Sequence, residues 1–212
     1  MYPRYPAEVL ARRDALPKKP EGVVLTGKHV ILEPLDLDRD ALALHAISDG
    51  SGDPPYDPDE RIWRFMSGGP FADAGALRAW LAPQVAAEDG QPFVVRSRAT
   101  GAPVGVACLI ANQPLHLKIE LGSIWYGASA QRTGASREAT QLLLGHVFRL
   151  GYLRAEWKCD ALNEPSRRAA QSYGFTFEGI QDAHYVIKGR RRDTAWYRIL
   201  AHEWAGTGSP TM

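Results

Sequence analysis

The amino-acid sequence predicts an α+β fold, with one mixed sheet and flanking helices. Segments in which apolar and polar residues alternate, as in strands, lie between segments whose apolar residues recur at helical spacing. Their order is strand, helix, helix, three strands, helix, strand, helix and two strands, which is an α+β pattern. The chain has 212 residues, of which 45% are hydrophobic, and this is enough for the core of one domain.

The first elements follow an N-terminal arm, residues 1–24, which is rich in Pro and basic residues. One short helix is expected in the arm, around residues 6–15. A strand is expected from Lys28, followed by a helix with Asp38 as its cap. Gly, Pro and Asp then predict a loop over residues 49–60.

The later elements rest on the same kinds of signal. Apart from one strand treated below, they are a helix over residues 73–85, two strands joined by a turn at 99–103, a helix over 139–150 that Gly151 ends, a strand over 153–160, a helix from Asn163 to Gly174, and a hairpin that turns near Gly189. The last residues, 205–212, are expected to form a C-terminal tail.

One predicted strand changes phase in its middle. In the segment LHLKIEL the apolar residues are odd-numbered and end at Leu121, whereas after Gly122 and Ser123 they are even-numbered and include Ile124 and Tyr126. Because side chains alternate along a strand, this change indicates an inserted residue, most simply a β-bulge. We therefore expect the strand to splay and to expose backbone groups that a ligand with amides could pair with.

The segment QRTGASREA, which precedes an apolar helix, is a candidate anion site. A helix start presents free N–H groups and the positive end of the helix dipole, and Gly134 lets the backbone come close to a ligand. Gln131, Arg132 and Thr133 add donors, and Ser136 can serve as a cap. From these residues alone an ordinary helix cap remains an alternative. The segment is neither a Walker loop nor a GxGxxG dinucleotide motif.

Three segments in this order and spacing, ELGSIWYG, QRTGASREA and ALNEPSRRAAQSYGF, resemble the GNAT superfamily of acetyl-coenzyme A dependent N-acetyltransferases. The resemblance covers residues 25–204, the expected GNAT domain, and points to the branch that includes bacterial acetylases of ribosomal-protein N-termini. It implies a mixed, mostly antiparallel sheet whose two central strands splay apart, with the coenzyme in the gap.

The resemblance also implies which residues bind acetyl-coenzyme A. The bulged strand would pair with the pantetheine amides, the segment around Gly134 would wrap the pyrophosphate, and the next strand and helix would reach the pantetheine. These residues are Ile124, Trp125, Tyr126, Gln131, Arg132, Thr133, Gly134, Ala135, Ser136, Asn163 and Ser166. Ser136 replaces the last small residue of the family motif. Ala170 stands where many members have a tyrosine that protonates the leaving thiolate, and Tyr173 lies almost opposite it on that helix.

Acetyl transfer needs a neutral amine, although a free alkylamine with a pKa of about 10.4 is mostly protonated at neutral pH. Glu120, on the polar face of the strand before the bulge, is the expected base, and the alternative is a solvated or salt-bridged strand carboxylate. His184 and His116 could act through water or be ordinary polar residues. Trp63 and Phe65, beside a glycine-rich loop, are expected with His184 on the acceptor side.

Composition narrows the function classes. Twenty-five Lys and Arg against 24 Asp and Glu give a net charge of +1, so no general field favours nucleic acid or an anionic membrane. The basic run Arg190–Arg192 is interpreted as a solvated turn. No apolar stretch has the length of a membrane span and no secretion signal is evident, so a cytoplasmic protein is expected. Cys108 and Cys159 lack a metal-binding spacing, which predicts buried thiols and no metal.

Two hypotheses for the function follow. The first is an acyltransferase that moves the acetyl group of acetyl-coenzyme A to a primary amine of a small molecule or of a peptide or protein N-terminus. The second is a non-catalytic coenzyme A binding sensor or partner module, which Ala170 keeps open. The acceptor depends on residues 49–70 and 179–193, and the sequence leaves room for a homodimer.

Overall fold

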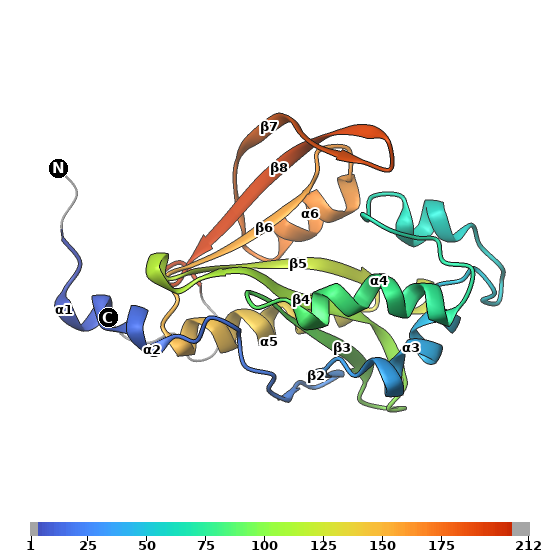
Figure 1. Ribbon diagram of the computed structural model, residues 1–212, viewed down its shortest axis with the longest axis horizontal. Coiled ribbons are helices and arrows are strands. Elements are labelled where there is room, and N and C mark those ends of the chain that lie inside the picture. The colour runs from blue at the N-terminus through green and yellow to red at the C-terminus, as the bar shows by residue number, and fades with distance from the viewer. Residues whose placement is uncertain (1–3, 205–212) are drawn as a thin grey trace.

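The computed structural model describes residues 4–204, which form one sheet flanked by helices (Figure 1). Eight strands lie in the order β1, β2, β3, β4, β5, β6, β8, β7. Neighbouring strands are antiparallel except β5 and β6, which are parallel. The predicted α+β class with a mixed, mostly antiparallel sheet is confirmed. The strands are β1 (Leu25–Thr26), β2 (Val30–Pro34), β3 (Gln91–Ser97), β4 (Pro103–Gln113), β5 (Lys118–Tyr126), β6 (Arg154–Asp160), β7 (Thr176–Ile187) and β8 (Arg190–Leu200).

The helices connect these strands and cover both faces of the sheet. They are α1 (Ala7–Leu10), α2 (Arg12–Ala15), α3 (Leu37–Ala46), α4 (Ala74–Ala86), α5 (Ala135–Leu150) and α6 (Glu164–Ser172), with a π-helical turn η1 (Asp59–Trp63) and two 3₁₀ turns, η2 (Pro114–His116) and η3 (Ala128–Ala130). Leu143 of α5 packs with Phe93 of β3 in one core, whereas Leu44 of α3 and Leu77 of α4 pack with Val94 in a second core. Phe93 and Val94 are neighbours in β3, so the two cores lie on opposite faces of the sheet.

The predicted β-bulge is present in β5. The register of the β4–β5 pair shifts between Val106 and Cys108, and Ser123 in the opposing strand has a φ of 50°. The bulge changes which residues face the core with α5: odd-numbered Leu121 packs there before the bulge, and even-numbered Tyr126 packs there after it. The change of phase in the sequence is therefore caused by a β-bulge, as predicted.

The sheet opens between β5 and β6. The two strands pair only near their starts, up to the pair formed by Glu120 and Glu156. Beyond that pair, β5 continues to Tyr126 and β6 to Asp160 with no pairing between the described residues of the two strands. Figure 1 shows β6 and β8 rising away from β5. The expected splay of two central strands is therefore confirmed.

Two of the predicted element starts are wrong. The cap of α3 is Asp36 rather than Asp38, because the Asp36 carboxylate accepts hydrogen bonds from the backbone N–H groups of Asp38 and Arg39 at 2.9 and 3.2 Å. The strand predicted to include Leu115 begins at Lys118, because the 3₁₀ turn η2 precedes it and leaves Leu115 exposed.

The N-terminal arm forms two short helical turns, α1 and α2, where one helix was expected. The side-chain amide of Asn112 in β4 donates to the carbonyls of Pro17 and Lys18 at 2.9 and 2.8 Å, so the end of the arm is held against the sheet. The division into arm, domain and tail stays a prediction, and the tail, residues 205–212, lies outside the described residues.

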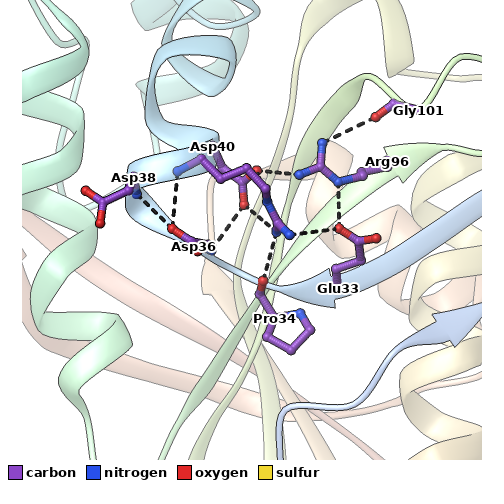
Figure 2. A network of polar contacts seen from close by, with 8 residues as sticks. Glu33, Pro34, Asp36, Asp38, Asp40, Arg96 and Gly101 are labelled. Atoms are coloured by element: carbon purple, nitrogen blue, oxygen red, sulfur yellow. Dashed lines mark hydrogen bonds and ion pairs between the residues drawn. The ribbon is translucent and has the colours of Figure 1, made fainter.

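A partly buried ionic network joins α3 to the sheet (Figure 2). Asp40 is 1% exposed and accepts hydrogen bonds from Arg39 and from Arg96 of β3, while Arg96 also binds Glu33 of β2 at 2.8 Å. Burial alone would raise the pKa of Asp40, but the hydrogen bonds from Arg39 and from the Asp36 N–H, together with the charge of Arg96, lower it below its usual value. The network therefore depends on Asp40 being ionised.

We expect Asp40→Asn to lower the free energy of unfolding by about 2 kcal/mol near pH 7, because Arg96 then faces a neutral amide. The pKa of Asp40 is depressed in the folded state. Its stabilisation is thus complete above the unfolded pKa of about 3.9 and is lost as the pH falls through the folded value. Urea unfolding from pH 7 to pH 3 should show the two proteins converging in acid. Asp38→Asn, whose side chain is 88% exposed, is the matched control and should cost less than about 0.5 kcal/mol. A difference that is constant over this pH range would contradict the assignment.

Candidate active site

A cavity of about 390 Å³ lies where β5 and β6 diverge. The open ends of the two strands form its floor, the start of α6 forms one side, and two distant segments complete the wall. The lining residues are Glu120 to Ile124 of β5, Trp157 to Asp160 of β6, Asn163 and Ser166 at α6, Ile110 and Ala111 of β4, Phe65 to Ser67 after η1, and Tyr185, Ile187 and Arg192 of the β7–β8 hairpin. Chemistry-bearing residues from six parts of the fold therefore meet in one place.

The bulged strand offers backbone groups to this opening. Gly127 donates its N–H to the Val104 carbonyl at 3.0 Å, and Trp125 pairs with Val106, so the backbone of Trp125 faces β4. Because strand residues alternate in the direction of their N–H and C=O groups, those of Ile124 and Tyr126 face the other way, toward the opening. Of these residues, Ile124 lines the cavity.

The other two strand residues predicted to bind the coenzyme are less accessible. Trp125 is 3% exposed and its side chain packs in the core with α3 and α4. Tyr126 packs in the core with α5, and its buried phenol oxygen has no hydrogen-bond partner within residues 4–204. Burial raises the pKa of the Tyr126 phenol well above its usual value, so the hydroxyl stays protonated.

The start of α5 has the geometry of an anion site. Gly134 is the N-cap with a φ of 90°, a conformation that favours glycine, and no side chain caps the helix. The expectation that Ser136 serves as a cap is therefore wrong, because Ser136 lies inside the first turn of α5. Within the described part of the chain, the N–H groups of Ser136 and Arg137 have no hydrogen-bond partner. Ala135 is buried at this turn, and its N–H makes only a long contact of 3.4 Å with the Thr133 hydroxyl. The free donors and the helix dipole together favour a negative ligand.

The residues before Gly134 shape this turn. The Gln131 side chain donates to the carbonyls of Tyr126 and Arg61, both at 3.2 Å, so it ties the turn to β5 and η1. Arg132 is exposed and has a φ of 65°. The Thr133 hydroxyl donates to the Ala130 carbonyl at 2.7 Å. Of these three predicted donors, only Arg132 keeps its side chain available for a ligand.

Glu120 is the buried carboxylate at the floor of the cavity. It is 6% exposed, and one of its oxygens lies 2.6 Å from the Lys158 ammonium of β6, which itself lies 4.1 Å from the centre of the Trp196 ring. Burial raises the pKa of Glu120 above its ordinary value, and Lys158 offsets only part of this increase. Glu120 therefore forms the salt bridge that the alternative interpretation expected. It also lines the cavity, as a catalytic base would have to.

Glu156, the partner of Glu120 in the β5–β6 register, has a different environment. It accepts a hydrogen bond from Arg154 at 2.8 Å and contacts Lys118 at 3.3 Å. Burial would raise the pKa of Glu156, but Arg154 and Lys118 together lower it. Glu156, which does not line the cavity, is thus held ionised, whereas Glu120, which lines it, has an increased affinity for a proton. Such a difference between two adjacent carboxylates is typical of sites for proton transfer.

The start of α6 contributes Asn163 and Ser166. The Asn163 side chain caps the helix by accepting from the Ser166 N–H at 3.1 Å, and the Ser166 hydroxyl accepts from the Trp157 indole at 3.0 Å. Ala170, by contrast, is fully buried in the core. Tyr173 packs against Trp157 and does not line the cavity, so no tyrosine of α6 faces it.

Among the residues predicted for the acceptor side, Phe65 lines the cavity and Trp63 does not. Trp63 is 0% exposed, and its indole donates to the Ser48 carbonyl at 3.0 Å. Its ring lies 4.9 Å from those of Phe71 and Trp125, between ring centres. The prediction for Trp63 is wrong, because the core under α3 and α4 takes up this aromatic side chain.

The two histidines lie outside the cavity wall. The His184 ring contacts the Tyr185 ring, with ring centres 3.9 Å apart, and its buried Nδ1 has no partner among residues 4–204. It is the neighbouring Tyr185 that lines the cavity. His116 is exposed in η2, before β5 begins. Neither position favours a histidine as the base.

The two expected acceptor segments are joined above the cavity. The Lys188 ammonium, at the turn of the β7–β8 hairpin, donates to the Trp63 carbonyl at 2.8 Å and to the Asp59 carboxylate at 3.1 Å. This contact holds the hairpin beside Phe65. The interpretation of residues 190–192 as a solvated turn fits the first two arginines, which are exposed, but it is wrong for Arg192, which lines the cavity.

Other predicted features concern metals, thiols and membranes. No group of His, Cys, Asp and Glu side chains within the described residues could hold a metal ion. Cys108 and Cys159 are free and buried, and burial raises the pKa of Cys108 to about 12. No helix between residues 4 and 204 is both long and apolar enough to cross a membrane.

Comparisons with known proteins bear on the nature of this site. Residues 29–176 match the family described as the acetyltransferase (GNAT) domain. A GCN5-related N-acetyltransferase from Brucella melitensis is 39% identical over 89% of this chain and 82% of its own, with a TM-score of 0.81. A GNAT-family protein from Chromobacterium violaceum is 34% identical over 89% and 91%, with a TM-score of 0.80. A Salmonella typhimurium enzyme that modifies the N-terminal serine of a 50S ribosomal subunit protein shares the fold, with 18% identity over 84% and 99% and a TM-score of 0.71. A search of curated proteins found no match.

Proposed function

The chain belongs to the GNAT acetyltransferase family, and from this premise we propose that it transfers the acetyl group of acetyl-coenzyme A to a primary amine. The acceptor would be a small molecule or the N-terminus of a peptide or protein. The observation that carries the proposal is the cavity between the diverging strands, with the Glu120 carboxylate at its floor. The expected cytoplasmic location and the homodimer stay predictions.

The residues present suit the coenzyme that the family uses. The unpaired N–H groups of Ser136 and Arg137 would receive the pyrophosphate, and the backbone groups of Ile124 and Tyr126 would pair with the pantetheine amides. Asn163, at the cavity wall, would lie beside the pantetheine. Acetyl-coenzyme A supplies a thioester, which is already activated toward an amine.

Glu120 would remove the proton that keeps the amine unreactive. A carboxylate with an elevated pKa is a stronger base than an ordinary glutamate, and the low exposure of Glu120 excludes water that would compete for it. Lys158 would hold the carboxylate in place. The wall of the cavity then keeps the amine next to the acyl carbon, and such positioning contributes several kcal/mol to catalysis, on the order of 7 in favourable cases.

The absence of a tyrosine at Ala170 favours a second candidate, a coenzyme A binding protein without catalysis. A thiol with a pKa of about 8.5 is, however, a good leaving group even without a proton donor. The first function is therefore compatible with Ala170.

An assay of free thiol separates the two functions. The purified chain is incubated with acetyl-coenzyme A and a panel of primary amines and peptides, and the thiol released is followed with a chromogenic disulfide. The proposal expects release that depends on the amine. Tight coenzyme binding by calorimetry, without amine-dependent release, would instead support the binding module.

A further inference from the structure

Arg192 occupies an unusual position in the wall of the cavity. It belongs to β8 and pairs with Tyr185 of β7, so both side chains come from the hairpin above the diverging strands. Its guanidinium carbon lies 5.5 Å from the centre of the Tyr185 ring. Both residues line the same cavity as Glu120.

The Arg192 guanidinium lacks a partner. Within residues 4–204 it makes no hydrogen bond or ion pair, and its Nε is buried and unsatisfied. Other arginines of the same sheet region are paired, as Arg154 is with Glu156 and Arg198 is with Glu203. A buried donor without an acceptor costs free energy, so this position indicates a partner that the chain itself does not provide.

The carboxylates nearest to Arg192 along the chain and in the cavity are engaged elsewhere. Glu120 is paired with Lys158, and Asp193 is paired with Arg191 at 2.7 Å. Asp160 accepts from the Leu162 N–H at 2.8 Å. The cavity wall that includes Arg192 also carries apolar side chains, among them Ile187 and Phe65, and its polar members Lys158 and Asp160 already have partners of their own.

A guanidinium presents a planar fork of N–H donors, which matches a carboxylate, and the Tyr185 ring 5.5 Å away leaves all the donors of Arg192 free among residues 4–204. We propose that Arg192 binds a carboxylate of the acceptor, so that the substrate is an amine that carries a carboxylate a few bonds away. This inference rests on the proposed function. It places the amine toward Glu120 and the carboxylate toward the β7–β8 hairpin, which lines the same cavity.

The test compares matched pairs of acceptors. They are 4-aminobutanoate with butylamine, 3-aminopropanoate with propylamine, and two peptides that differ only by Glu or Gln at the second residue. We expect the intact chain to prefer the carboxylated member by about 10- to 100-fold in kcat/KM, the range for a charged hydrogen-bonded contact. The peptide pair distinguishes a peptide acceptor from a free amino acid.

Two variants assign the preference to Arg192. Arg192→Gln should bring the ratio within about threefold of unity, because the fork and its charge are both lost. Arg190→Gln on the same strand, whose side chain is exposed, is the matched control and should keep the ratio. The Kd for coenzyme A, measured by calorimetry, should be the same in all three proteins.

The outcomes separate this inference from the proposed function. Equal rates with both members of each pair would overturn the inference and leave acetyl transfer intact. Weaker coenzyme binding by Arg192→Gln would also overturn it, since the arginine would then belong to the coenzyme site. If no amine is acetylated, acetyl transfer fails, and 4-aminobutanoate is titrated into the coenzyme-bound protein. Binding that Arg192→Gln abolishes would support the carboxylate site, and absence of binding would overturn it.

Discussion

Replacing Glu120 by glutamine is expected to lower kcat by about 10²- to 10³-fold, because the amide has nearly the same size but cannot accept a proton from the amine. The Kd for acetyl-coenzyme A should change by less than about twofold, since the groups expected to bind the coenzyme lie on the open edge of β5 and at the start of α5. The amide oxygen still faces Lys158, so the cavity floor should keep its shape.

The pH dependence gives this prediction a second readout. Glu120 must be ionised to act as a base, so kcat/KM of the intact chain should fall as the pH drops through the pKa of Glu120, which burial raises above its usual value. Glu120→Gln should lack this acid limb. Glu156→Gln is the matched control, because its carboxylate lies beside Glu120 in the register but does not line the cavity; it should lose stability and keep kcat. Equal kcat in the intact chain and Glu120→Gln would remove Glu120 from the chemistry.

Replacing Ser136 by aspartate is expected to weaken coenzyme binding by about 100-fold. The new carboxylate would lie in the first turn of α5, next to the free N–H groups, where the pyrophosphate is expected. Two like charges about 5 Å apart at an effective dielectric constant of about 20 repel by about 3 kcal/mol, which corresponds to this loss. The same substitution should not destabilise the fold, because an acidic residue is favourable at a helix N-terminus.

Calorimetry measures the predicted loss of coenzyme affinity, and thermal unfolding measures the predicted unchanged stability. Ser136→Ala is the control and should bind the coenzyme within about twofold of the intact chain, because the site depends on backbone groups. Ser136→Asp should keep its Tm. Unchanged coenzyme affinity in Ser136→Asp would place the pyrophosphate elsewhere, and a large loss of Tm would mean that the variant does not test the site.

The sequence predicts the features of the site that depend on local periodicity. The change of phase after Leu121 is visible because strand side chains alternate strictly, and it correctly predicts the bulge and the opening of the sheet. Gly151 correctly predicts the end of α5, whereas the helix begins at Ala135, four residues before the predicted start, because its first turn lacks the apolar periodicity that marks residues 139–150. The start of the short helix near Asn163 is also predicted correctly, and the structure shows that the Asn163 side chain caps it.

What the sequence does not reveal depends on contacts between distant segments. Lys158 pairs with Glu120 only because β5 and β6 are neighbours in the sheet. Glu138 accepts three hydrogen bonds from the turn before β2, at Lys28, His29 and Val30, although more than 100 residues separate them. No local pattern distinguishes such residues from solvated charges.

Burial explains the errors at Trp63 and Arg192. Trp63 lies in a segment with polar and glycine-rich flanks, which suggests exposure, yet its ring fills the core under α3 and α4. Arg192 ends a run of three arginines, which suggests a solvated turn, yet it lies in β8 and lines the cavity. Alternation along β8 separates Arg192 from Arg191 but not from Arg190, which has the same parity and is exposed, so the sequence alone does not single out Arg192.

The central claim is that the coenzyme lies in the opening between β5 and β6, with its pyrophosphate at the start of α5. Titration of the ¹⁵N-labelled chain with coenzyme A, followed by amide chemical shifts, tests this most directly. The largest shifts are expected at Ile124, Tyr126, Ser136 and Arg137, whose N–H groups face the opening or lack partners. Saturable binding that leaves these four amides unchanged would contradict the claim.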